Sequence, residues 1–137
     1  MKNIKEYIVT ETSSEYLKDI KEYIINEAST TSFVNKIKNE FKKEFGDKVT
    51  LTSAKANFTQ LYDIYIYDEN LETLKKVNEI LKKHLTLWKG FTDEELKNKI
   101  DEHNKFMKEY GEKYPWKDSP IEFFRFTSRD VKKILNQ

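Results

Sequence analysis

Arg125 and Arg129 are the residues of this chain best suited to hold an anion, because they are its only arginines among 25 basic side chains. A guanidinium offers a rigid fork of N–H donors that matches a carboxylate or a phosphate. Thr127 and Asp130 have the spacing of a helix N-terminal capping box, which places Arg129 in a first helical turn. The helix dipole disfavours a cation there by about 0.3–1 kcal/mol. An anion bound beside Ser128 would offset that cost.

The same segment also has the composition of a single-stranded nucleic-acid site. Residues 113–137 carry six basic and three acidic side chains, with aromatic residues between them, and such a mixture suits stacking on bases beside phosphates. In the competing interpretation, Glu122 and Asp130 neutralise the arginines and the aromatic rings fill the core. The predicted anion or nucleic-acid site comprises Trp116, Arg125, Ser128, Arg129, Lys132 and Lys133.

A second candidate surface lies on the predicted strand over residues 59–67. Side chains alternate between the two faces of a strand, so Tyr62, Ile64 and Ile66 share one face and Asp63, Tyr65 and Tyr67 share the other. If the first set packs inward, two tyrosines and a carboxylate face outward, and tyrosine is enriched at protein interfaces. We therefore predict a partner-binding strip at Asp63, Tyr65 and Tyr67. The competing interpretation is that a helix covers this face and buries both rings.

Several kinds of chemistry have no support in the residues. The chain has no cysteine and three glycines, so it offers neither a thiolate nor a glycine-rich phosphate loop. His84 and His103 fall on different predicted helices without a second ligand at zinc spacing. We predict no catalytic residues, no metal site and no cofactor. A metal-dependent nuclease that uses dispersed carboxylates such as Asp63 and Asp68 is the third functional hypothesis.

Composition fits one domain over residues 1–137, since this length is typical of a single domain. The 25 basic and 24 acidic side chains nearly cancel, so any binding to nucleic acid must use a local patch. No apolar run approaches the roughly 20 residues that span a bilayer. We expect a cytoplasmic protein that does not act at a membrane.

Hydrophobic periodicity predicts an α+β domain, with about five helices packed on a small, mainly antiparallel sheet. The third helix is expected to start at a cap on Asp68 and to carry exposed i,i+4 ion pairs Glu72/Lys76 and Glu79/Lys83. Thr92 and Glu95 form a capping box before the fourth helix. The expected helices cover about residues 12–27, 33–45, 69–85, 93–110 and 128–135. The expected strands are 48–52, 59–67 and 121–126, with polar residues 53–57 joining the first two as a hairpin, while residues 4–10 fit a strand or a helical turn.

These observations favour a non-enzymatic module that binds a larger protein. Small inhibitors made by phages and mobile elements, including anti-CRISPR proteins, share this size and composition, although no residue pattern carries the likeness. The alternative is a nucleic-acid-binding accessory protein that uses the basic and aromatic C-terminal segment. The sequence is also compatible with a homo-oligomer.

Overall fold

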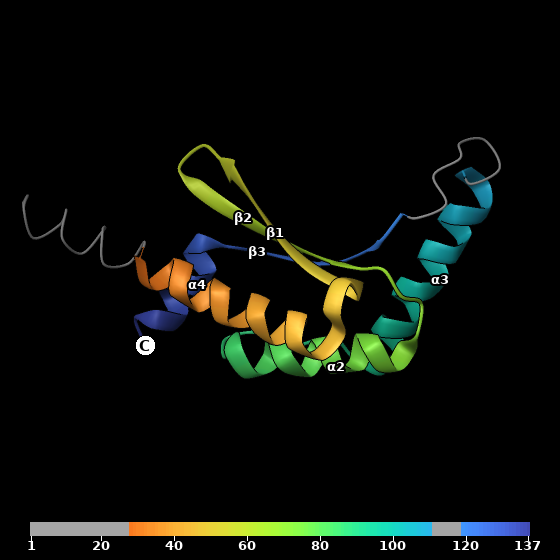
Figure 1. Ribbon diagram of the computed structural model, residues 1–137, viewed down its shortest axis with the longest axis horizontal. Helices are drawn as coiled ribbons and strands as arrows, with labels where there is room; N and C mark the ends of the chain where they lie inside the picture. Colours follow the sequence, from red (N-terminus) through yellow and green to blue (C-terminus); the bar gives the residue numbers. More distant parts are fainter. Residues whose placement is uncertain (1–27, 111–118) are drawn as a thin grey trace, which may run out of the picture.

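A three-stranded antiparallel sheet, with helices gathered mainly against one of its faces, forms the centre of the computed structural model (Figure 1). The structure describes residues 28–110 and 119–137. The expected elements before residue 28, and Trp116, lie outside this described part. Within it, no helix is both long and apolar enough to cross a membrane. The order is a helix over residues 28–45, a short 3-10 turn η1 (Gly46–Lys48), β1 (Val49–Ala56), β2 (Thr59–Ile66), α2 (Leu71–His84), α3 (Asp93–Tyr110), β3 (Ile121–Thr127) and α4 (Ser128–Leu135).

The predicted α+β class and the β1–β2 hairpin are confirmed, although the hairpin is longer than expected. β1 pairs with β2 from Val49 opposite Ile66 to Ala56 opposite Thr59. Asn57 adopts a left-handed backbone conformation with φ 56°, which asparagine tolerates better than most residues. The chain therefore reverses over two residues. Residues 53–56, which we had expected in the connection, belong to the strand for this reason.

A bulge in β3 determines which of its side chains are buried. Phe124 lies opposite Ile64 and Glu122 lies opposite Tyr65, so Phe123 is an extra residue in the ladder. Simple alternation would put Phe123 and Phe126 on opposite faces, and the extra residue resets that alternation. Both rings are consequently buried.

The core lies between the sheet and the helices on that face. Tyr62, Ile64 and Ile66 are buried, as the alternation predicted, and they pack against apolar residues of the 28–45 helix, α2 and α4. The other members of this core are Val34, Ile37, Phe41, Val49, Leu51, Leu74, Val77, Leu81, Leu85, Leu96, Ile121, Phe123, Phe126 and Val131.

Three of the predicted helix caps fall in the described residues, and two of these are confirmed; the capping box predicted at Thr12 and Glu15 lies outside that part. Glu95 N donates to Thr92 Oγ1 at 3.2 Å and Thr92 N donates to Glu95 Oε1 at 3.1 Å, and the Thr127/Asp130 box before α4 is complete. The cap predicted at Asp68 is wrong, because α2 begins after Asn70, whose side chain accepts from Glu72 N at 3.0 Å.

The expected i,i+4 ion pairs on α2 are also wrong. Glu72 Oε1 lies 3.7 Å from Lys75 Nζ, and Glu79 Oε1 lies 3.6 Å from Lys82 Nζ. Each glutamate thus pairs with the lysine three residues later, and not with the one four residues later. Lys83 turns instead toward Glu40 on the 28–45 helix. Tertiary packing supplies that partner, which helix periodicity alone does not reveal.

Candidate partner-binding groove

Arg125 and Asp63 join the two predicted sites across neighbouring strands. Arg125 Nε donates to Asp63 Oδ1 at 2.6 Å and Nη2 donates to Oδ2 at 3.3 Å. They are directly opposite each other in the β2–β3 ladder, on the face opposite Ile64. This contact, together with the negative charge of Asp63, raises the pKa of Arg125. In the competing interpretation of the sequence, Glu122 neutralises Arg125; in the structure Asp63 does so, because it lies directly opposite in the ladder.

Asp63 and Tyr65 line a hollow of about 450 Å³ between the sheet and α3. Its other walls include Lys99 on α3 and Glu122 on β3. A second hollow, of about 290 Å³, also contacts Lys99 and Glu122 and continues along α3 to Phe106. The two hollows therefore adjoin at these shared residues.

A third hollow extends the same depression to Tyr67. It has a volume of about 430 Å³, and His103 and Ile121 line both this hollow and the second one. We call the three adjoining hollows the α3–β3 groove. All three residues of the predicted partner-binding strip line it, Asp63 and Tyr65 in the first hollow and Tyr67 in the third. Tyr65 is half-buried and Tyr67 is exposed.

Aromatic rings form the apolar part of the first hollow. The Phe91 ring meets Phe123 edge-on with centroids 5.3 Å apart, and it meets Phe124 at 5.8 Å. Trp88 stacks on Phe124 with centroids 4.4 Å apart. Such offset and edge-to-face pairs hold the rings in fixed positions. The groove thus has a preformed aromatic wall.

Asn78 of α2 holds Phe91 in place. Its side chain is buried, its Nδ2 donates to Phe91 O at 3.0 Å, and its Oδ1 accepts from Phe91 N at 2.9 Å. Gly90, the preceding residue, has φ +81°. A Cβ there would lie 2.5 Å from Lys82 Cδ and 3.3 Å from Asn78 Oδ1. The turn into α3 therefore requires glycine.

Lys99 is a second cation of the groove besides Arg125, and sequence reasoning missed it. Its Nζ lies 4.2 Å from the centroid of the Phe91 ring, and its side chain is half-buried. Burial lowers the pKa of Lys99, while the charges of Glu102 and Glu95 act in the opposite direction. One signal was available, because Lys99 stands three residues after Leu96, on the side of the 93–110 helix that carries its apolar residues.

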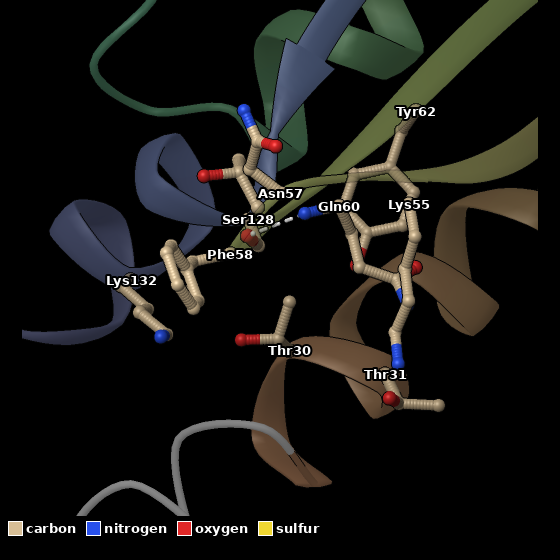
Figure 2. A pocket seen from close by; sticks show the side chains of 10 residues that line it. Thr30, Thr31, Lys55, Asn57, Phe58, Gln60, Tyr62, Ser128 and Lys132 are labelled. Atoms are coloured by element: carbon tan, nitrogen blue, oxygen red, sulfur yellow. Dashed lines mark hydrogen bonds between the residues drawn. The ribbon is translucent and has the colours of Figure 1, made fainter.

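The predicted anion site is divided between different parts of the fold. Ser128 and Lys132 line a separate cavity of about 220 Å³, which we call the hairpin-end cavity (Figure 2). Ser128 is buried, and its Oγ accepts from Gln60 N at 3.1 Å, so it joins α4 to the hairpin. Arg125 lines the groove instead. Arg129 and Lys133 are exposed on α4, and neither lines the cavity.

Two further residues of the hairpin-end cavity were not predicted. Lys55 and Phe58 belong to the β1–β2 hairpin, and Figure 2 shows Phe58 on the same side of the view as Lys132, with Lys55 on the opposite side. Phe58 is fully exposed at the turn. Residues of the β1–β2 hairpin and of α4 line this cavity, and α4 stands at one end of the sheet while α3 stands at the other (Figure 1). The fold therefore separates the two sites.

Within residues 28–110 and 119–137, no group of three or more His, Asp or Glu residues is arranged to hold a metal ion. Asp63 is bound to Arg125, and Asp68 accepts from Asn70 N at 3.1 Å and from Thr73 Oγ1 at 2.7 Å. Both carboxylates thus have structural partners. Comparisons with protein-family models, curated proteins and solved structures found no match.

Proposed function

We propose that this protein is a non-enzymatic protein-binding module that holds a segment of a larger partner in the α3–β3 groove. One observation carries the proposal: Asp63, Tyr65 and Tyr67, which alternate along a single strand, all line the same groove. Aromatic rings and charged side chains line the first hollow of the groove together. Protein interfaces likewise combine aromatic contact area with polar groups.

The dimensions of the groove suit a short extended segment. Along α3 its lining residues run from Lys99 to Met107. At 1.5 Å per helical residue this is about 12 Å, which matches about four residues of an extended chain. Tyrosine contributes contact area at low cost in side-chain entropy. Arg125 holds Asp63 in place across the strands, so this part of the surface is ordered before a partner arrives.

The size and composition of the chain support an inhibitor of the kind made by phages and mobile elements. In that case the partner is a component of a host defence complex, and the groove contacts one of its exposed segments. A few residues carry most of the binding energy of an interface, and tyrosine is common among them. Tyr65 and Tyr67 are therefore the first residues to replace.

The experiment is a pull-down from extract of the organism that encodes the chain, using the wild type and Tyr65→Ala/Tyr67→Ala. Leu87→Ala is the matched control, because Leu87 is 52% exposed, Tyr67 is 50% exposed, and Leu87 does not line the groove. We expect the double variant to remain folded and to lose the partner that the wild type and Leu87→Ala retain. A folded double variant that captures the same proteins would contradict the proposal.

Nucleic-acid binding is a second candidate function, favoured by Phe58 at the hairpin-end cavity. A fully exposed ring beside Lys55 and Lys132 combines a stacking surface with positive charge. The test is binding of labelled single-stranded and duplex oligonucleotides over a salt series, with Phe58→Ala as the variant. Real phosphate contacts give an affinity that falls steeply with salt. An absent or salt-independent signal would contradict this function.

A further inference from the structure

We propose that the α3–β3 groove selects a partner segment that carries a carboxylate, which pairs with Lys99 while an adjacent apolar side chain contacts Phe91 and Phe123. This inference rests on the proposed function, since it names the chemistry of the segment that the groove would hold. It goes further by predicting which peptides bind and which do not. The position and neighbours of Lys99 carry the argument.

Lys99 is a half-buried ammonium whose close contacts are aromatic. Its Nζ lies 4.2 Å from the Phe91 centroid and 5.8 Å from the Phe123 centroid. An ion pair requires a nitrogen–oxygen distance of at most 4.0 Å. In the part of the chain that the structure describes, no carboxylate oxygen lies that close to Lys99 Nζ. The two rings stabilise the positive charge of Lys99 by cation–π contacts, but less than a carboxylate would.

The carboxylates around Lys99 do not supply a direct counter-ion. Glu95 and Glu102 lie about one turn away on α3, are exposed, and act on Lys99 only through their charge. Glu122 on β3 lines the same hollow and is exposed. Asp63 on β2 is bound to Arg125. The amine is therefore the group in this hollow that most needs a negative partner.

Binding of a segment increases the cost of leaving the Lys99 ammonium without a counter-ion. A segment lying in the groove removes much of the remaining water from Lys99, and desolvating an ammonium without a counter-ion is costly. A purely apolar segment bears that cost, and a cation placed opposite Lys99 adds repulsion. A carboxylate opposite Lys99 offsets the loss of water with a charge-assisted hydrogen bond. The lowered pKa of Lys99 that burial causes agrees with this interpretation, because it reports that the charged form is already incompletely solvated.

The aromatic wall defines the second feature of the segment. Phe91 and Phe123 adjoin Lys99 in the first hollow, so a side chain next to the carboxylate meets these rings. An apolar or aromatic side chain gains contact area there. The predicted motif is thus an acidic residue beside an apolar one, in an extended conformation.

The test begins with a random-peptide library displayed on phage and selected on the intact protein. The best peptides are synthesised with a fluorescent label, each with a partner in which Glu or Asp becomes Gln or Asn. Their affinities are measured by fluorescence polarisation against the wild type, Lys99→Met, Lys99→Arg and Lys97→Met. Lys99→Met keeps an apolar side chain in the hollow, Lys99→Arg keeps the charge, and Lys97 is an exposed neighbour on the same helix.

We expect selected peptides to share an acidic residue next to an apolar one. Lys99→Met and the acid-to-amide change should each weaken binding about tenfold, and the two changes combined should cost little more than either alone. Lys99→Arg and Lys97→Met should retain most of the affinity. Peptides that lose affinity with Tyr65→Ala/Tyr67→Ala, but show no acidic preference and no loss with Lys99→Met, would overturn this inference and leave the proposed function intact. Peptides that are insensitive to both sets of groove variants would count against both.

Discussion

Arg125 on β3 holds the carboxylate of Asp63 on β2 through two hydrogen bonds, of 2.6 Å and 3.3 Å, on the sheet face opposite the core. The pair is exposed on the arginine side, so solvent screens it and its contribution to stability is small. Its geometric effect is larger, because Arg125→Lys keeps the charge and loses the two-pronged contact. We expect the melting temperature of Arg125→Lys to match that of the wild type and its affinity for a groove-binding peptide to fall. A large loss of melting temperature would show that the pair is mainly structural.

Asn78 should be among the most sensitive polar positions. Asn78→Ala removes both hydrogen bonds to the Phe91 backbone and leaves half-buried backbone groups without these partners. We expect a loss of about 2–3 kcal/mol in the free energy of unfolding, measured with urea. Asn70→Ala, which removes the cap of α2, should cost about 1 kcal/mol. Equal effects of the two variants would show that Phe91 is held by other contacts.

Gly90 and Gly46 form a matched pair, since both have positive φ, +81° and +61°. Alanine at either position bears the cost of a left-handed backbone, about 1 kcal/mol. At Gly46 a Cβ meets nothing within 4 Å, whereas at Gly90 it meets the Lys82 side chain and Asn78 Oδ1. Gly90→Ala should therefore lower the free energy of unfolding more than Gly46→Ala does. The reverse order in denaturant melts would contradict the described turn.

Glu40 predicts a specific dependence of stability on pH. Hydrogen bonds from Lys83 and His84 lower the pKa of Glu40 below its ordinary value of 4.5, and His84 Nε2 lies 2.6 Å from Glu40 Oε2. A lowered folded-state pKa gives stability that is present above the unfolded pKa and lost as pH falls through the folded one. The wild type should exceed Glu40→Gln by about 1 kcal/mol at neutral pH. That advantage should shrink as pH drops below about 4.5 and vanish in stronger acid.

The control for this profile is Glu44→Gln, because Glu44 is an exposed carboxylate one turn further along the same helix. Urea unfolding at a series of pH values should give little difference between Glu44→Gln and the wild type. A Glu40→Gln difference that is independent of pH would mean that the side chain acts through packing alone.

Local signals were enough to predict much of the fold. The capping boxes at Thr92 and Thr127 each depend on residues three apart, and the structure contains both. The inward packing of Tyr62, Ile64 and Ile66 follows from alternation along one strand. The cap at Asn70 was missed because Asp68, Glu69 and Asn70 are all polar, and the backbone conformation decides which of them caps the helix.

Features that depend on a distant partner were not predictable. The full length of β1 follows from the backbone conformation of Asn57, and the burial of Phe123 follows from a bulge that exists only in the ladder with β2. Asp63 was assigned to one site and Arg125 to another, since nothing local indicates that strands β2 and β3 bring them together. The spacing from Leu96 places Lys99 on the apolar side of α3, but its contact with the Phe91 ring depends on the turn that precedes the helix.

Site-specific photo-crosslinking tests the central claim most directly. A benzophenone amino acid replaces Tyr67 in the groove in one protein and Leu87 in another, two positions with nearly equal exposure, 50% and 52%. Both proteins are expressed in the organism that encodes the chain, and crosslinked species are identified by mass spectrometry. Our account predicts that position 67 crosslinks to a segment of one larger protein and that position 87 does not. The same crosslinks from both positions, or a partner captured only from position 87, would contradict it.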